Sequence, residues 1–307
     1  MTVLSALFLD PFVHPFMQRA LVAGIMIGAV CAVLSCFLVL RGWSLMGDAV
    51  SHAVLPGIVL AYVLSIPLVI GAFVAGLGCA LGIGYLKENS RVKEDTVMGI
   101  VFSGMFALGL VLFTKIDSDQ HLLHVLFGNM LGVTWRDILE MAAIAIPTFA
   151  IVMVKRRDLL LYCFDSGHAR AIGLSVRILH FGLLALLALT IVAALKAVGV
   201  ILVTAMLIAP GAIGYLLARR FDRMLGIAMI SAVGSCIVGT IASYHLDAST
   251  GPCIVLVQAI LFGAAFAWNV WRSDMMRLVR GRFVFGAESA LLVGADAPDR
   301  PRPDGQA

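Results

Sequence analysis

The sequence predicts an all-α, polytopic membrane protein with about eight or nine transmembrane helices. Two observations predict this class. Hydrophobic residues make up 61% of the 307 positions and charged residues only 13%, and mean hydropathy is +1.03. The charged residues are also gathered into short segments that separate apolar runs of about 20 residues, the length that a helix needs to cross the hydrocarbon core of a bilayer.

The expected spans follow one another with short connections. The first ends at Arg41 and Trp43, a basic and aromatic pair typical of a membrane interface. Within it, Gly24 and Gly28 favour close packing against another helix. The expected spans cover residues 19–40, 47–65, 67–85, 96–114, 137–154, 179–195, 198–218, 224–244 and 253–271. The sixth and seventh form a hairpin around Lys196.

Residues 122–133 are too short to cross a bilayer, and we expect them to be either re-entrant or interfacial. Four basic segments fall on one side when the spans are counted in order: residues 87–95, 155–158, 219–223 and 272–282. Because cytoplasmic loops carry an excess of Lys and Arg, the N-terminus is predicted outside and the C-terminus in the cytoplasm.

The chain is expected to have three parts. Residues 1–17 form an N-terminal interfacial segment, residues 18–283 the transmembrane domain, and residues 284–307 a disordered tail. The first part lacks the basic region and cleavage site of a removable signal peptide. The last is rich in Pro, Asp and Arg towards its end.

Asp48 and His52 place an acid and an imidazole inside an otherwise apolar run. Four residues apart on a helix, they share one face and can hold one cation together. Ionisable side chains within a span mark transport pathways, and the alternative is a buried pair that only joins two helices. Pro56 and Gly57 are expected to interrupt the same helix, which is tolerated only where the freed backbone groups meet protein or a water-filled cavity.

A second Pro-Gly pair, Pro210 and Gly211, lies in another apolar run and is also followed by a tyrosine. Broken helices at corresponding places in two halves of a chain indicate a central pathway. Two such pairs also arise by chance. The sequence leaves these two explanations open.

Several motif classes are absent from the sequence. There is no phosphate-binding loop of the form Gly-x-x-x-x-Gly-Lys-Ser/Thr, so the chain is not expected to hydrolyse ATP by itself. No His-Glu-x-x-His or Gly-x-Ser-x-Gly motif supports a protease or hydrolase. The six cysteines form no Cys-x-x-Cys pair, and five that fall in apolar runs are expected in the core: Cys31, Cys36, Cys79, Cys236 and Cys253. Basic residues report on topology here and indicate no nucleic-acid partner.

Three ordered segments carry a family resemblance. Residues 37–57 (FLVLRGWSLMGDAVSHAVLPG) and 197–210 (AVGVILVTAMLIAP) resemble the two hallmarks of bacterial ABC importer permeases for zinc, manganese and iron. Residues 164–174 (FDSGHARAIGL) are similar to the cytoplasmic coupling segment of that family. Residues 166–168 depart from its commoner Pro-Glu-Phe-like stretch. The resemblance covers roughly residues 15–275.

The resemblance implies an ABC importer permease fold of the metal/vitamin-B12 type in the bacterial cytoplasmic (inner) membrane. The implied partners are the lipid bilayer, a cytoplasmic ABC ATPase dimer, an extracytoplasmic metal-binding protein and a second permease subunit, either the same chain or a paralogue. Asp48 and His52 become a transient transport site, and no cofactor is bound permanently. The implied ATPase contacts are Phe164, Asp165, Ala169, Ala171, Gly173 and Leu174.

The loops at residues 87–96 and 118–128 look like those of the manganese and iron branch of this family rather than the zinc permeases. One carboxylate and one imidazole suit Mn²⁺ or Fe²⁺, although Zn²⁺ also accepts both. The loop after the span at residues 96–114 is predicted to lie outside. It is either simply solvated, or it concentrates cations or contacts a binding protein. Its candidate residues are Asp117, Asp119, His121 and His124.

The alternative function is an ion-gradient-driven secondary metal transporter. It explains Asp48 and His52 as well as an ABC importer permease does. It does not explain the long polar inner segment with a short helix, which suits docking of a cytoplasmic ATPase. A purely structural membrane scaffold does not explain the buried acid and imidazole.

Overall fold

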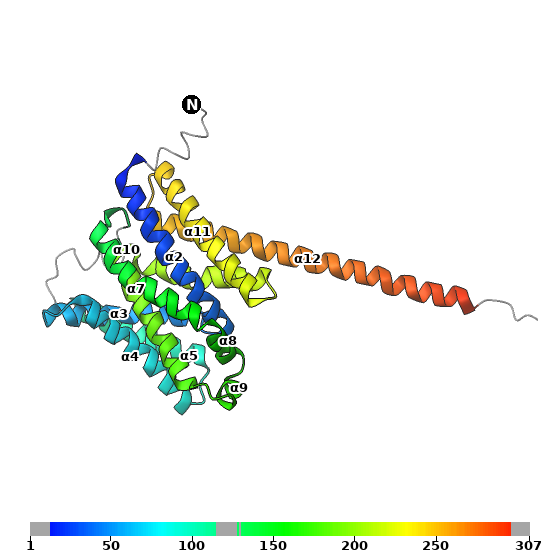
Figure 1. The fold of residues 1–307 in the computed structure, drawn as a ribbon, viewed down its shortest axis with the longest axis horizontal. Coiled ribbons are helices and arrows are strands. Elements are labelled where there is room, and N and C mark those ends of the chain that lie inside the picture. The colour runs from blue at the N-terminus through cyan, green and yellow to red at the C-terminus, as the bar shows by residue number, and fades with distance from the viewer. Residues whose placement is uncertain (1–12, 115–127, 129, 296–307) are drawn as a thin grey trace, which may run out of the picture. The chain divides into compact units, whose positions relative to one another are not determined.

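A computed structural model describes residues 13–114, 128 and 130–295, and within these ranges it contains helices and no strands (Figure 1). The elements are α2 (Pro15–Arg41), α3 (Met46–Val63), α4 (Leu68–Asn89), α5 (Glu94–Thr114), the 3₁₀-helix η1 (Met130–Gly132), α7 (Trp135–Val154), α8 (Arg156–Phe164), α9 (Ser166–Ala171), α10 (Val176–Leu217), α11 (Phe221–Leu246) and α12 (Thr250–Ala295). In the described part, nine helical stretches are long and apolar enough to cross a membrane, two of them within α10. The predicted all-α, polytopic class is confirmed.

The chain divides into two compact units, Met1–Gly263 and Ala264–Ala307. In the first unit α2 is central, packing against α7, α10 and α11. Gly24 and Gly28 lie against Cys236 of α11, whose Sγ is 3.2 Å from the Gly24 carbonyl oxygen. The close packing predicted for this glycine pair is therefore present.

Gly199 divides α10 into two helical segments. Its backbone, at φ 74° and ψ 172°, adopts a conformation that residues with a Cβ rarely reach. Gly128, also at positive φ, lies directly against the Gly199 backbone, where a Cβ would overlap the main chain. The two spanning stretches are separated at Lys196 as predicted, and the backbone leaves the helical conformation three residues later, at Gly199. Glycine at position 199 permits the positive φ, and glycine at position 128 permits the close contact.

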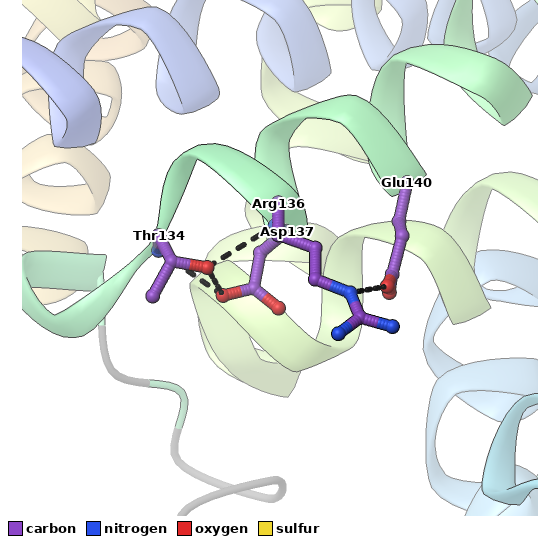
Figure 2. A network of polar contacts seen from close by, with 4 residues as sticks. All are labelled: Thr134, Arg136, Asp137 and Glu140. Atoms are coloured by element: carbon purple, nitrogen blue, oxygen red, sulfur yellow. Dashed lines mark hydrogen bonds and ion pairs between the residues drawn. The ribbon is translucent and has the colours of Figure 1, made fainter.

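A capping box begins α7 (Figure 2). The Thr134 hydroxyl accepts a hydrogen bond from the Asp137 amide, and the Asp137 carboxylate accepts from the Thr134 amide at 3.1 Å. Arg136 in the same turn forms an ion pair at 3.3 Å with Glu140, one turn further along the helix. These contacts satisfy amide groups that have no partner within the helix, so α7 begins at Trp135, ahead of the predicted start at Asp137.

The two ends of the chain differ in detail from the predicted boundaries. Helix α2 begins at Pro15, and residues 1–12 lie outside the described part. The α12 backbone is helical to Ala295, so the predicted tail boundary at 284 falls inside a helix. The physical reason is composition: after Pro252 the next proline is Pro298, and Ala, Leu and Glu in residues 284–295 favour helix. Residues 296–307 are outside the described part, as are most of residues 122–133.

Candidate functional site

The Asp48–His52 pair lies near the start of α3. Asp48 Oδ1 is 3.5 Å from His52 Nε2, and the two side chains are 36% and 25% exposed. Asp48 sits in the first turn, where the positive end of the helix dipole favours a carboxylate. The predicted shared face is therefore real, and it remains partly open in the single chain.

The second imidazole nitrogen of His52 is in a different environment. Nδ1 is buried and has no hydrogen-bond partner among the described residues. The imidazole ring makes edge-to-face contacts with Phe102 and Phe106 of α5, at centroid distances of 4.9 and 5.2 Å. These two aromatic rings fix the imidazole beside Asp48 and shield one side of the pair.

Helix α3 runs unbroken through Pro56, contrary to the expected interruption. Proline has no amide hydrogen, so the carbonyl four residues earlier, that of His52, receives no helical hydrogen bond from it. The consequence of Pro56 is therefore local: it releases one backbone oxygen on the residue that also supplies the imidazole.

Glycines hold α3 close to its neighbours. Gly57 lies about 180° around the helix from Asp48, and it meets the Gly71 carbonyl of α4. A Cβ at Gly109 of α5 would lie 2.9 Å from Pro56 Cδ. Gly57 thus anchors the back of α3 on α4, which leaves the Asp48–His52 face directed towards α5.

The second Pro-Gly pair has a different environment. The Gly211 amide donates to Ser35 Oγ at 2.9 Å, and the Ser35 hydroxyl donates to the Ile208 carbonyl at 3.2 Å. Gly211 is also in direct contact with the Ser35 backbone. Groups around Pro210 are thus satisfied by α2, and Gly211 packs α10 closely against α2, much as Gly57 packs α3 against α4.

The predicted coupling segment forms the short helix α9. Asp165 caps it by accepting from the His168 amide at 2.8 Å, and Gly173, at φ 88°, follows its end. Ala169 was predicted to contact the ATPase. It is fully buried against its own chain, so it does not belong to an accessible docking surface. Ala171 and Gly173 are exposed.

Two large apolar side chains flank α9 on the surface. Phe164 is 70% exposed and Ile172 is 57% exposed. Phe164 was among the predicted contacts, whereas Ile172 was not. An exposed isoleucine beside a short polar helix is indistinguishable in sequence from a core residue, so its role could not be inferred before the fold was known.

Arg41, which is predicted from sequence only to mark a membrane interface, also makes contacts inside the fold. Its guanidinium lies over the rings of Trp43 and Tyr162, 5.6 and 4.7 Å from their centroids. Burial raises the pKa of Tyr162, and the nearby Arg41 opposes this shift. Burial likewise raises the pKa of the neighbouring Cys163 thiol to about 11. These residues tie the α2–α3 turn to α8.

Within the described residues, no group of three or more His, Cys, Asp or Glu side chains is close enough to hold a metal ion. Asp48 and His52 thus form a pair and not a complete coordination shell. The four candidates of the outer loop, Asp117, Asp119, His121 and His124, lie outside the described residues.

A bundle of apolar spanning helices with an acid–imidazole pair inside one span is typical of a membrane transport protein. The chain matches the model of the ABC 3 transport family over residues 13–269. It belongs to this family.

Its relatives include two curated membrane proteins. The chain is 64% identical over 269 residues to the "Chelated iron transport system membrane protein YfeD" of Yersinia pestis, covering 88% of this chain and 91% of that protein. It is 54% identical over 253 residues to the "Manganese transport system membrane protein MntB" of Synechocystis, covering 82% and 83%.

Solved structures agree with the fold. The chain resembles a chain of "PsaBC from Streptococcus pneumoniae in complex with Fab" with a TM-score of 0.76 and 38% identity, covering 84% of this chain and 94% of that one. An inward-facing conformation of a putative metal-chelate type ABC transporter shares the fold, with a TM-score of 0.62 at 18% identity and coverage of 83% and 85%.

Proposed function

We propose that the chain is the permease subunit of an ATP-driven importer that moves Mn²⁺ or Fe²⁺ across the bacterial inner membrane into the cytoplasm. The observation that carries the proposal is the Asp48–His52 pair, partly open and 3.5 Å apart in a spanning helix. Support comes from relatives named for chelated iron and manganese transport. Zn²⁺ is the alternative substrate, since it accepts the same ligand types.

The donors of one chain suit weak, reversible binding. The Asp48 carboxylate, the His52 imidazole and the His52 carbonyl released by Pro56 provide about three or four atoms, whereas Mn²⁺ and Fe²⁺ usually take about six. A second permease subunit related by a two-fold axis would bring the same set to a shared site. Such a site opens when the subunits move, which allows the ion to be released.

The proposed partners follow from the family and from the surface around α9. A separate ATPase dimer would supply hydrolysis, and an extracytoplasmic metal-binding protein would deliver the ion. The exposed side chains Phe164, Ala171 and Ile172 suit a docking contact with that ATPase. The second permease subunit is either a copy of this chain or a paralogue.

Uptake of ⁵⁴Mn²⁺ into proteoliposomes that contain the assembled complex tests this function. Asp48→Asn and His52→Gln keep the approximate shape of each side chain and remove one donor, so each should reduce ATP-driven uptake to background while the complex still assembles and hydrolyses ATP. Asp247→Asn and His14→Gln are matched controls at exposed positions away from the pair, and they should transport normally.

The chain reconstituted without an ATPase discriminates the alternative function. It should show no uptake under an imposed proton gradient. Gradient-driven uptake in this preparation would establish a secondary transporter instead. Normal Mn²⁺ and Fe²⁺ uptake by the Asp48/His52 double variant would reduce the pair to a structural contact between helices.

A further inference from the structure

A basic cavity, distinct from the Asp48–His52 pair, opens where α4, α8, α9 and α10 meet the turn between α2 and α3. Its volume is about 660 Å³. Three arginines line it, Arg41, Arg170 and Arg177, together with Lys87, and its lining residues include no Asp or Glu. The cavity therefore gathers positive charge from four separate elements of the fold.

Three carboxylates of α8, α9 and α11 have partners of their own. Asp158 pairs with Lys155 at 3.1 Å, and Asp222 pairs with Arg156 at 3.3 Å. Asp165 accepts the backbone amide of His168 as the cap of α9. These three acids help to hold α8 and α9 in place. Because no Asp or Glu lines the cavity, an anion from outside the chain can bind its arginines.

The inner wall of the cavity is built from aromatic groups. Arg41 stacks over Tyr162, whose hydroxyl is 2.8 Å from Nδ1 of His180. Trp43, only 2% exposed, lines the same cavity, and its buried indole N–H has no hydrogen-bond partner among the described residues. Arg41 is thus fixed at the wall, whereas Arg170 and Arg177 are exposed and can close on a ligand.

The cavity also has an apolar side at the ends of two spanning helices. Ala80 and Ile83 of α4 line it together with Phe181 and Leu184 of α10. A free phosphate ion would use only the arginines, whereas a phospholipid would place its phosphate among them and its glycerol and acyl chains along this apolar side. Basic pockets between membrane helices bind anionic lipid headgroups in this way.

We propose that this cavity binds the phosphate of an anionic phospholipid, such as phosphatidylglycerol or cardiolipin, at the membrane surface. The lipid links α9 to α4 and α10 through a charge-assisted contact with Arg170 and Arg177. This proposal concerns lipid binding and stands independently of which metal the protein transports.

Binding of short-chain dihexanoyl-phosphatidylglycerol to the purified full-length chain in a neutral detergent tests the proposal, with native mass spectrometry or thermophoresis as the readout. Dihexanoyl-phosphatidylcholine and inorganic phosphate are the comparison ligands. Phosphatidylglycerol should bind at least about tenfold more tightly than either. Equal binding of the two lipids would overturn the proposal, and phosphate binding as tight as that of phosphatidylglycerol would show a site for free phosphate.

The double variant Arg170→Gln/Arg177→Gln should weaken phosphatidylglycerol binding by about tenfold or more. Arg219→Gln/Arg223→Gln removes the same charge from a basic segment that does not line the cavity, and it should bind like the parent chain. All four arginines are exposed, so neither variant disturbs a buried group. An equal loss in both variants would show general electrostatic attraction and would overturn the site.

Discussion

Single residues decide how closely the spans approach one another and how the Asp48–His52 pair is presented. His52 is supported by Phe102 and Phe106, and Pro56 releases its carbonyl without breaking α3. On the far face of the same helix, Gly57 rests on Gly71. The Asp48–His52 pair thus lies on a helix that contacts α5 on one face and α4 on the other.

Gly57→Ala should destabilise the protein, because the added Cβ would fall on the Gly71 carbonyl oxygen and push α3 away from α4. Gly78→Ala is a matched control, since Gly78 lies on α4 with nothing within 4 Å of an added Cβ. Thermal unfolding in detergent should show a lower midpoint for the first variant and an unchanged or higher one for the second, as alanine favours helix by roughly 1 kcal/mol. Equal midpoints would show that α4 moves freely away from α3.

The pair itself could be found from the sequence because an acid and an imidazole four residues apart in an apolar run stand out against any membrane span. The structural role of each Pro-Gly pair could not be predicted from the sequence. Whether Gly57 meets Gly71 and whether Gly211 meets Ser35 depends on which helices become neighbours, and these contacts join residues that are distant in the chain.

Helices follow from composition more directly than their connections do. The apolar runs of about 20 residues and the charged segments between them predict the nine spanning stretches, because this is the length at which a helix crosses a bilayer with its backbone hydrogen-bonded. The breaks depend on single residues: Gly199 sets the division of α10, and Thr134 sets the start of α7. The buried side of α9 depends on its packing, which is why Ala169 was misplaced on the docking face.

The two alanines of α9 should separate folding from coupling. Ala169→Trp inserts a large side chain where no space exists, and we expect destabilisation of about 1–3 kcal/mol or failure to fold. Ala171→Trp is at an exposed position, so the protein should fold normally while ATP-driven uptake is lost. Thermal unfolding and uptake measured on both variants check this. Normal uptake by a well-folded Ala171→Trp complex would place the ATPase contact elsewhere.

The arrangement of charge over the whole transmembrane unit supports one orientation in the membrane. The Arg156–Asp222 ion pair joins the basic segments at residues 155–158 and 219–223, and the basic cavity brings Lys87 together with Arg170. Tyr162 of α8, the helix that begins at Arg156, lines the same cavity as Lys87, so three of the four basic segments predicted to be cytoplasmic lie on elements that are connected in the fold. A chain that placed this end outside would contradict the excess of Lys and Arg in cytoplasmic loops.

Cysteine labelling in intact cells tests this orientation. All six native cysteines are buried, so a membrane-impermeant maleimide should react mainly with an introduced thiol. Asp247 follows α11 at the end predicted to be outside. The Asp247→Cys variant should therefore be labelled in intact cells from which any outer membrane has been removed. Arg170→Cys should be labelled only after permeabilisation. The reverse pattern would place the basic cavity and α9 on the outer surface, out of reach of a cytoplasmic ATPase, and it would remove the structural basis for coupling through α9.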